Sequence, residues 1–213
     1  MKRVRLFLMI LIAASIVMAC NQKAKKDQKP IVSKTVENLK TALKDELTTV
    51  EKYRAYSERA RADGYGQISA LFNAIARSEG IHANNHIGVL TSLGITADST
   101  KGSFVVKSTK ENLEESINGE AKEVFVLYPA YIKSANDENA PDAIRTFTWA
   151  MGIEKKHGYF YQSALEALKT NDLTELPYEY LICPKCGNTF EEIELEPKCP
   201  FCKTDKGKFI VVK

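Results

Sequence analysis

Two Glu-x-x-His motifs, each inside a helical pattern of apolar residues, constrain most strongly what this chain can fold into. They are Glu79-Gly-Ile-His82 and Glu154-Lys-Lys-His157. Around each motif apolar residues recur every three or four positions, which predicts helices with one buried face. Residues three positions apart lie above one another on a helix, so both groups of each motif fall on that face. A buried carboxylate is costly without a compensating charge, and two such pairs indicate a metal site.

The pattern repeats along the chain as two helical hairpins. Glu46 corresponds to Glu120, and Glu79 corresponds to Glu154, at nearly the same separation. In an antiparallel hairpin, residues equidistant from the turn lie level with each other. Each hairpin therefore places one glutamate opposite one Glu-x-x-His motif, and packing the hairpins together predicts a four-helix bundle with these groups at one level.

The helices are predicted over residues 35–62, from the turn at 63–66 to about 93, over 108–135 and over 141–169. Gly94 fits a helix C-cap. Ser108 with Glu111 is typical of a capping box, and Pro141 fits a first helical turn. The connection 95–108 has short extended potential at residues 104–106, and residues 171–177 read as a linker.

The predicted bundle site contains five glutamates and two histidines. They are Glu46, Glu79, His82, Glu120, Glu123, Glu154 and His157. Carboxylate oxygens with imidazole suit iron or manganese, and also admit zinc. The alternative, helix-surface glutamates with core histidines, suits one motif better than two motifs in register. His86 is expected to be a core or rim residue. Tyr53 and Tyr128 are either core residues or hydrogen-bond donors to ligand carboxylates.

Four cysteines near the C-terminus form two Cys-x-x-Cys pairs. They are Cys183, Cys186, Cys199 and Cys202, in a segment over 178–213 that has no helical period. Four thiolates bind iron or zinc tetrahedrally, so an iron centre and a zinc ribbon both remain open, as do two disulfides. The net charge of +3 comes from the basic residues among the first five, and a nucleic-acid partner is not expected.

Residues 1–20 are interpreted as an export signal. A basic start is followed by an apolar stretch over 6–18 that is too short to span a bilayer comfortably. Val17-Met18-Ala19-Cys20 resembles a bacterial lipobox, with Met18 in place of the usual small residue. Cys20 is thus expected to carry a lipid, residues 21–32 to be a polar tether, and the domain to face the periplasm or the cell exterior on a membrane. An uncleaved anchor, or a cleaved signal with an incidental cysteine, is the alternative.

Taken together, these motifs resemble the rubrerythrin family over about residues 33–213. The similarity rests on Glu46 with Tyr53, on both Glu-x-x-His motifs, on Glu120 and Glu123 followed by Tyr128-Pro129, and on the four cysteines. It implies an all-α, ferritin-like four-helix bundle over 33–170 and a small β-rich, rubredoxin-like domain over 178–213. It also implies two non-haem irons in the bundle and one iron, or else zinc, on the cysteines.

The resemblance further implies a peroxidase that reduces hydrogen peroxide to water in oxidative-stress defence. Electrons would enter at the four-cysteine iron, His82 would exchange with a carboxylate as the redox state changes, and the chain would form a homodimer. The export signal departs from this pattern, because NAD(P)H is absent outside the inner membrane and the electron donor is then unknown. A ferroxidase or non-catalytic iron-binding protein with a structural zinc is the alternative, and a zinc-ribbon interaction protein is a third.

Overall fold

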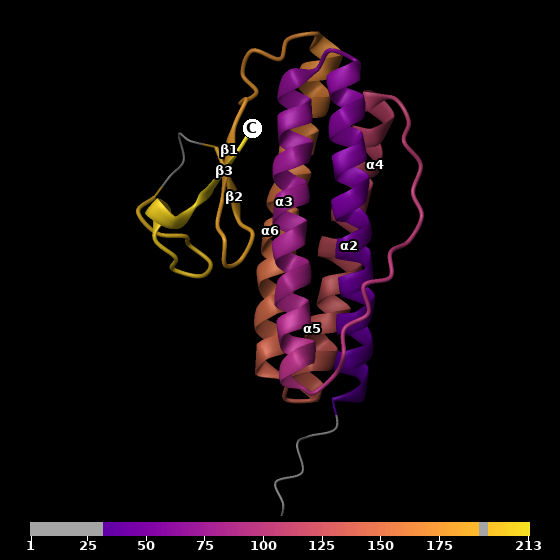
Figure 1. The fold of residues 1–213 in the computed structure, drawn as a ribbon, viewed down its shortest axis with the longest axis vertical. Coiled ribbons are helices and arrows are strands. Elements are labelled where there is room, and N and C mark those ends of the chain that lie inside the picture. Colours follow the sequence, from indigo (N-terminus) through magenta and orange to yellow (C-terminus); the bar gives the residue numbers. More distant parts are fainter. Residues whose placement is uncertain (1–31, 192–195) are drawn as a thin grey trace, which may run out of the picture. The chain divides into compact units, whose positions relative to one another are not determined.

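In the computed structural model of the chain, the residues described are 32–191 and 196–213. The predicted signal, Cys20 and nearly all of the tether lie outside them. The helices form a bundle of two hairpins (Figure 1). The first hairpin is α2 (Ser33–Ala62) with α3 (Gly66–Ser92). The second is α6 (Pro141–Thr170) with a long segment made of α4 (Thr109–Lys122), η1 (Glu123–Leu127) and α5 (Tyr128–Asp137). The predicted fold class is confirmed.

The helix ends follow the local sequence. Gly64, with φ of +89°, allows the tight turn between α2 and α3, since a side chain is strained in this conformation. Ser108 and Glu111 form both hydrogen bonds of the predicted capping box at the start of α4. Pro141 occupies the first turn of α6, where its missing N–H costs nothing.

The third long helix runs without a break from Thr109 to Asp137, but it is not α-helical throughout, which the sequence did not predict. Its middle, η1, is a π-helix. Pro129 lies just beyond it and cannot donate the backbone hydrogen bond that an α-helix requires at that position. A wider turn accommodates such a break, and π-turns are frequent at functional sites. Here the π-helix begins at Glu123, one of the predicted ligands.

The connection between the hairpins forms no strand in the described structure, although extended potential was predicted at 104–106. It runs along α2, held by Gly102 N–H donating to Thr48 Oγ1 at 2.7 Å and Tyr56 O–H donating to the Val105 carbonyl at 3.2 Å. An extended segment without a neighbouring strand must satisfy its backbone groups in this way.

The C-terminal domain is a small antiparallel sheet with strand order β2-β1-β3. β1 (Tyr180–Ile182) pairs with β2 (Thr189–Phe190) and with β3 (Ile210–Val212). Tyr180 and Ile182 are buried in the same apolar cluster as Phe72 and Tyr161 of the bundle. The sheet therefore packs directly on the helices.

Two apolar clusters occupy the bundle, one around Phe72 and Tyr161 and the other around Leu43 and Phe147. The predicted ligands belong to neither, although six of the seven are buried. No helix among the described residues is long and apolar enough to cross a membrane.

Candidate metal centres

All four long helical segments contribute to a buried polar layer in the bundle. Glu46 comes from α2, Glu79 and His82 from α3, Glu120 from α4, Glu123 from η1, and Glu154 and His157 from α6. Each is at most 3% exposed except Glu123, which is partly exposed. The register argument from the two hairpin turns therefore predicted their common level.

The six buried groups form two overlapping clusters. Glu46, Glu79, His82 and Glu154 place ligand atoms within 4.8 Å of one another, and so do Glu79, Glu120, Glu154 and His157. Glu79 and Glu154 belong to both clusters. Two glutamates shared between two histidine-containing sets are the arrangement that carboxylate-bridged metal pairs in helical bundles require.

The contacts between histidines and glutamates are close. His82 Nδ1 lies 2.7 Å from Glu154 Oε1 and 3.0 Å from Glu79 Oε2. His157 Nδ1 lies 2.6 Å from Glu154 Oε2 and 3.3 Å from Glu79 Oε1. Both Glu154 oxygens and His157 Nδ1 are nevertheless buried without a hydrogen bond of normal geometry. Oxygen and nitrogen atoms that converge without bonding to each other fit metal ligands, so this donor set fits a pair of ions.

The electrostatics of the layer also fit bound cations. Burial, followed by the charges of Glu79 and Glu154, raises the pKa of Glu46 well above its ordinary value. Burial and nearby glutamates likewise raise the pKa of Glu120 and Glu123. Burial alone would lower the pKa of His157, but Glu154 and Glu79 raise it to about 10. Protons therefore neutralise the layer in the absence of metal, and cations would displace them.

Both tyrosines left open by the sequence reach carboxylates of candidate ligands. Tyr53 O–H donates to Glu120 Oε1 at 2.6 Å, and Tyr128 O–H donates to Glu46 Oε1. His86 is fully buried, with its Nε2 3.4 Å from the Tyr128 hydroxyl and its Nδ1 3.2 Å from Thr146 Oγ1. It lies outside both ligand clusters, at the edge of the layer.

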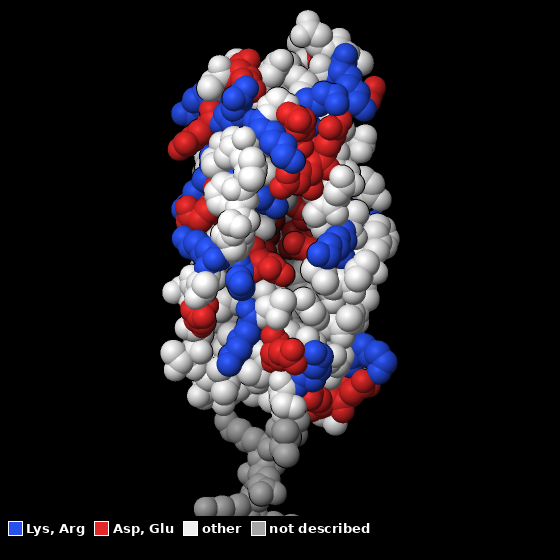
Figure 2. All heavy atoms as spheres, turned by 90° about the vertical axis from the view of Figure 1, so that its right-hand side faces the viewer, with Lys and Arg blue, Asp and Glu red and all other residues white. Residues whose placement is uncertain are grey.

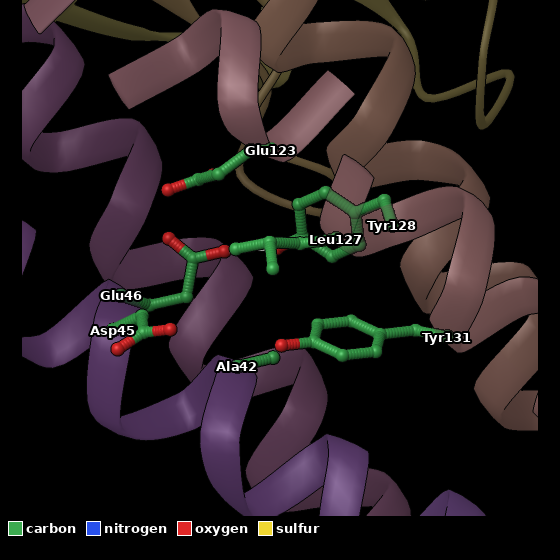
Figure 3. A pocket seen from close by; sticks show the side chains of 7 residues that line it. All are labelled: Ala42, Asp45, Glu46, Glu123, Leu127, Tyr128 and Tyr131. Atoms are coloured by element: carbon green, nitrogen blue, oxygen red, sulfur yellow. Dashed lines mark hydrogen bonds between the residues drawn. The ribbon is translucent and has the colours of Figure 1, made fainter. Parts of the chain in front are cut away.

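Glu123 lies outside the two clusters and lines a small pocket beside them. Figure 3 shows its carboxylate and that of Glu46 reaching into the same space from opposite helices. Asp45 and Tyr131 also line this pocket, whose volume is about 10 Å³. The sequence reasoning did not single out Asp45 or Tyr131. The only signal for Asp45 was its position next to Glu46.

One face of the molecule, shown in Figure 2, carries Asp and Glu side chains near its middle with Lys and Arg side chains around them. Both signs of charge are mixed among the described residues of this face. The mixture agrees with the low net charge and gives no basis for nucleic-acid binding there.

The four predicted cysteines form a second candidate centre. Cys183 Sγ lies 3.3 Å from Cys202 Sγ, and Cys186 Sγ lies 3.5 Å from Cys199 Sγ. All four are free thiols, so the structure does not form the two disulfides left open by the sequence.

Each Cys-x-x-Cys turn is closed by a residue with positive φ, Gly187 at +86° and Lys203 at +61°. Backbone N–H groups of these residues donate to the carbonyls of Cys183 and Cys199. Two such turns enclosing four thiols fit a tetrahedral metal.

The first cysteine turn lies directly against the histidines of the bundle. Ser78 Oγ donates to the Gly187 carbonyl at 2.6 Å, and His157 Nε2 lies 3.2 Å from Thr189 Oγ1. A Cβ atom on Gly187 would lie 2.6 Å from His82 Nε2. Only glycine therefore fits here. Sequence reasoning did not find these contacts, because no periodicity links the two segments.

The fold and the two centres define a ferritin-like helical bundle joined to a rubredoxin-like four-cysteine domain. Comparison with known proteins agrees. Residues 37–165 match the family model of rubrerythrin. The chain belongs to the rubrerythrin family, which comprises di-iron proteins of oxidative-stress defence whose members are in general oxidoreductases.

Individual relatives match nearly the whole described chain. Rubrerythrin-2 of Clostridium acetobutylicum is 36% identical over 177 residues, covering 82% of this chain and 95% of the relative. Nigerythrin of Nitratidesulfovibrio vulgaris is 33% identical, covering 86% and 89%. A solved structure of fully reduced, all-ferrous nigerythrin superposes with a TM-score of 0.76 at 31% identity, covering 92% of this chain and 95% of that one.

Proposed function

We propose that this chain is a non-haem di-iron peroxidase that reduces hydrogen peroxide to water. Two irons would be held by the bundle residues, and a third iron on the four cysteines would pass electrons to them. The observation that carries this proposal is the contact between the first cysteine turn and the bundle histidines. Gly187 follows Cys186 in the chain and lies so close to His82 that a Cβ atom on it would be 2.6 Å from the ring Nε2. A structural zinc on the four cysteines would not need this contact between the cysteine turn and the bundle histidines.

The protein's own groups suit the reaction in three ways. Glu79 and Glu154 lie between the two histidines and would hold both ions. Tyr53 and Tyr128 orient Glu120 and Glu46 through hydrogen bonds, which keeps the outer carboxylates in place. Glu123 reaches into a pocket of about 10 Å³, which suits a molecule little larger than water. When bound, a ferrous pair would supply the two electrons that the O–O bond of hydrogen peroxide takes up.

Iron rather than zinc on the cysteines is part of this proposal. An iron held by four thiolates accepts and donates one electron, whereas zinc has no redox chemistry. The nigerythrin structures are described in all-ferrous, mixed-valent and partially reduced states, which supports redox-active iron in a close relative.

The decisive measurement combines metal content with a visible spectrum of the mature chain. Three irons per chain, with a thiolate-to-iron colour that reductant bleaches and hydrogen peroxide restores, is the expected result. Two irons with one zinc would remove the electron entry. A bundle that takes up iron, keeps the oxidised ions as a mineral core and turns over no peroxide would favour an iron-storing ferroxidase instead.

The place of the protein in the cell is a further part of the proposal. We infer that Cys20 is lipidated and anchors the domain to a membrane on its periplasmic or outer side, with an electron donor other than NAD(P)H. Incorporation of a labelled fatty acid, lost on substituting Cys20→Ala, would support the anchor. A chain that remains unlabelled and cytoplasmic would contradict it. Sizing of the mature chain tests the proposed homodimer.

A further inference from the structure

An apolar groove lies between the segment α4–η1 and helix α6. Its volume is about 230 Å³. Its walls are Ile117, Ala121, Val124, Phe125, Gly158 and Tyr159. Glu120 and Glu154, two of the candidate iron ligands, also line it, and Lys155 and Gln162 complete the lining. The groove thus joins the protein surface to the buried polar layer.

The outer part of the groove is built from aromatic side chains that the fold does not bury. Phe125 is 74% exposed and Tyr159 is 63% exposed. The π-helix contributes to this arrangement, since Glu123 at its start reaches the small pocket while Phe125 stands in the groove wall. Large exposed apolar side chains around a hollow mark a binding surface more often than an ordinary part of the surface.

The two openings beside the metal layer differ in size and chemistry. The pocket at Glu123 is about 10 Å³ and contains Asp45, Glu46 and Tyr131. The groove is about 230 Å³ and is walled mainly by hydrocarbon. For comparison, an engineered apolar cavity of about 150 Å³ in another protein binds benzene. Hydrogen peroxide needs no such space, whereas a phenyl or branched alkyl group fits it.

We propose that this groove binds the organic group of an alkyl or aryl hydroperoxide, which the protein reduces at the same metal layer. This inference rests on the proposed peroxidase function and extends its substrate class. The hydroperoxide takes two electrons from the ferrous pair and two protons, its O–O bond breaks, and it leaves as one alcohol and one water. The alcohol keeps the organic group in the groove until it dissociates.

Selectivity between two peroxides tests the proposal. In Ala121→Trp the added indole fills the groove, and the ratio of kcat/KM for cumene hydroperoxide to kcat/KM for hydrogen peroxide should fall about tenfold or more, because the aryl group loses its apolar contacts. Val126→Trp is the matched control. Val126 belongs to the π-helix that follows α4 and is 59% exposed, but it lines neither opening, so the ratio should stay at its wild-type value.

Binding gives a readout that does not depend on turnover. In the full mature chain loaded with redox-inert zinc, cumyl alcohol should bind the wild type and the Val126→Trp variant. The Ala121→Trp variant should bind it about tenfold more weakly, by the same loss of apolar contact. Ligand-observed NMR measures this affinity, and a crystal soaked with the alcohol should show the ring between Phe125 and Tyr159.

The possible failures are distinguishable. An unchanged peroxide ratio in Ala121→Trp, with hydrogen peroxide still reduced, overturns the groove and leaves the proposed function standing. Failure of the wild type to reduce either peroxide overturns the proposed function and this inference with it. A dimer that dissociates in Ala121→Trp while cumyl alcohol binds neither protein assigns the groove to a second copy of the chain and also overturns the inference.

Discussion

Tyr53 on α2 donates a hydrogen bond of 2.6 Å to Glu120 Oε1 on α4, across the interface between the two hairpins. The duplicated half makes the reciprocal contact, because Tyr128 of the second hairpin donates to Glu46 of the first. Each tyrosine thus orients the glutamate of the other hairpin. The two bonds hold the hairpins in register at the level of the candidate metal pair.

Substituting Tyr53→Phe should weaken metal binding with little change in the fold. Glu120 would lose its donor while staying buried, and outer hydrogen-bond partners of metal ligands typically contribute a factor of about 10–100 in affinity. Competition between the chain and a ferrous chelator measures this loss. Tyr128→Phe should have a similar effect through Glu46.

Tyr56→Phe is the control for this pair. Tyr56 is also fully buried, but its hydroxyl contacts Glu115 and the Val105 carbonyl, away from the layer. Its loss should lower the free energy of unfolding by about 1 kcal/mol and leave iron affinity unchanged. Equal iron affinities in all three variants would contradict the positioning role of Tyr53 and Tyr128.

Much of the bundle could be predicted from the sequence, because local signals carry it. The helical period, the Asp63-Gly64 turn and the two Glu-x-x-His motifs all follow from residues close in the chain. Glu46 and Glu79 fall level because both lie equally far from one turn. The same reasoning placed Glu120 level with Glu154.

The remaining features depend on tertiary contacts that no local pattern encodes. The sequence left Tyr53 as either a core residue or a hydrogen-bond donor to a carboxylate, and did not indicate that this carboxylate belongs to the other hairpin. The π-helix that begins at Glu123 lies just before Pro129, which interrupts the backbone hydrogen bonds of the helix. A proline in the sequence does not by itself show whether the helix kinks, ends or forms a π-turn there. The contact of Gly187 with His82 joins segments far apart in the chain, and the sequence shows only a glycine after a cysteine.

Substituting Glu123→Ala should leave the fold intact and lower peroxide turnover. Glu123 is partly exposed, begins a π-helix and makes no contact in the two apolar clusters, so the melting temperature should change little. Its carboxylate lines the small pocket together with that of Glu46, so kcat/KM for hydrogen peroxide should fall by about a hundredfold or more, the low end of the range for a lost proton-transfer group. Glu114→Ala, an exposed change on α4, is the control. Full activity in Glu123→Ala would remove this glutamate from the site.

Substituting Gly187→Ala should uncouple the two metal centres. The new Cβ would meet His82 Nε2 at 2.6 Å and Ser78 Oγ at 2.9 Å, so the cysteine turn must move away from the bundle. Electron transfer from the four-cysteine iron should slow because the two centres lie further apart, while the thiolate colour remains because the four thiolates still hold the iron. Rapid-mixing spectroscopy of the reduced protein with hydrogen peroxide follows that colour directly.

Gly64→Ala separates backbone strain from this steric effect. Gly64 also has a positive φ, +89°, but a Cβ there meets nothing within 4 Å. It should cost about 1 kcal/mol of stability without changing the transfer rate. If both variants transfer electrons at the wild-type rate, the contact between Gly187 and His82 is not on the electron path.

His86 should make the iron-free chain less stable as the pH falls. Burial, and then the charge of His82, lower the pKa of His86 to about 3 in the folded state. In the unfolded chain its pKa returns to about 6.5. The unfolded state therefore binds one more proton between these values, so the stabilisation is complete above about pH 6.5 and is lost as the pH falls toward 3. At pH 5 the loss amounts to about 2 kcal/mol relative to neutral pH.

Urea unfolding of the wild type and His86→Gln at pH 5 and pH 7 measures this loss, since His82 and His157 are present in both chains and their contributions largely cancel. The wild type should lose about 2 kcal/mol more than the variant; parallel losses in the two chains would show that His86 is not held neutral by its burial.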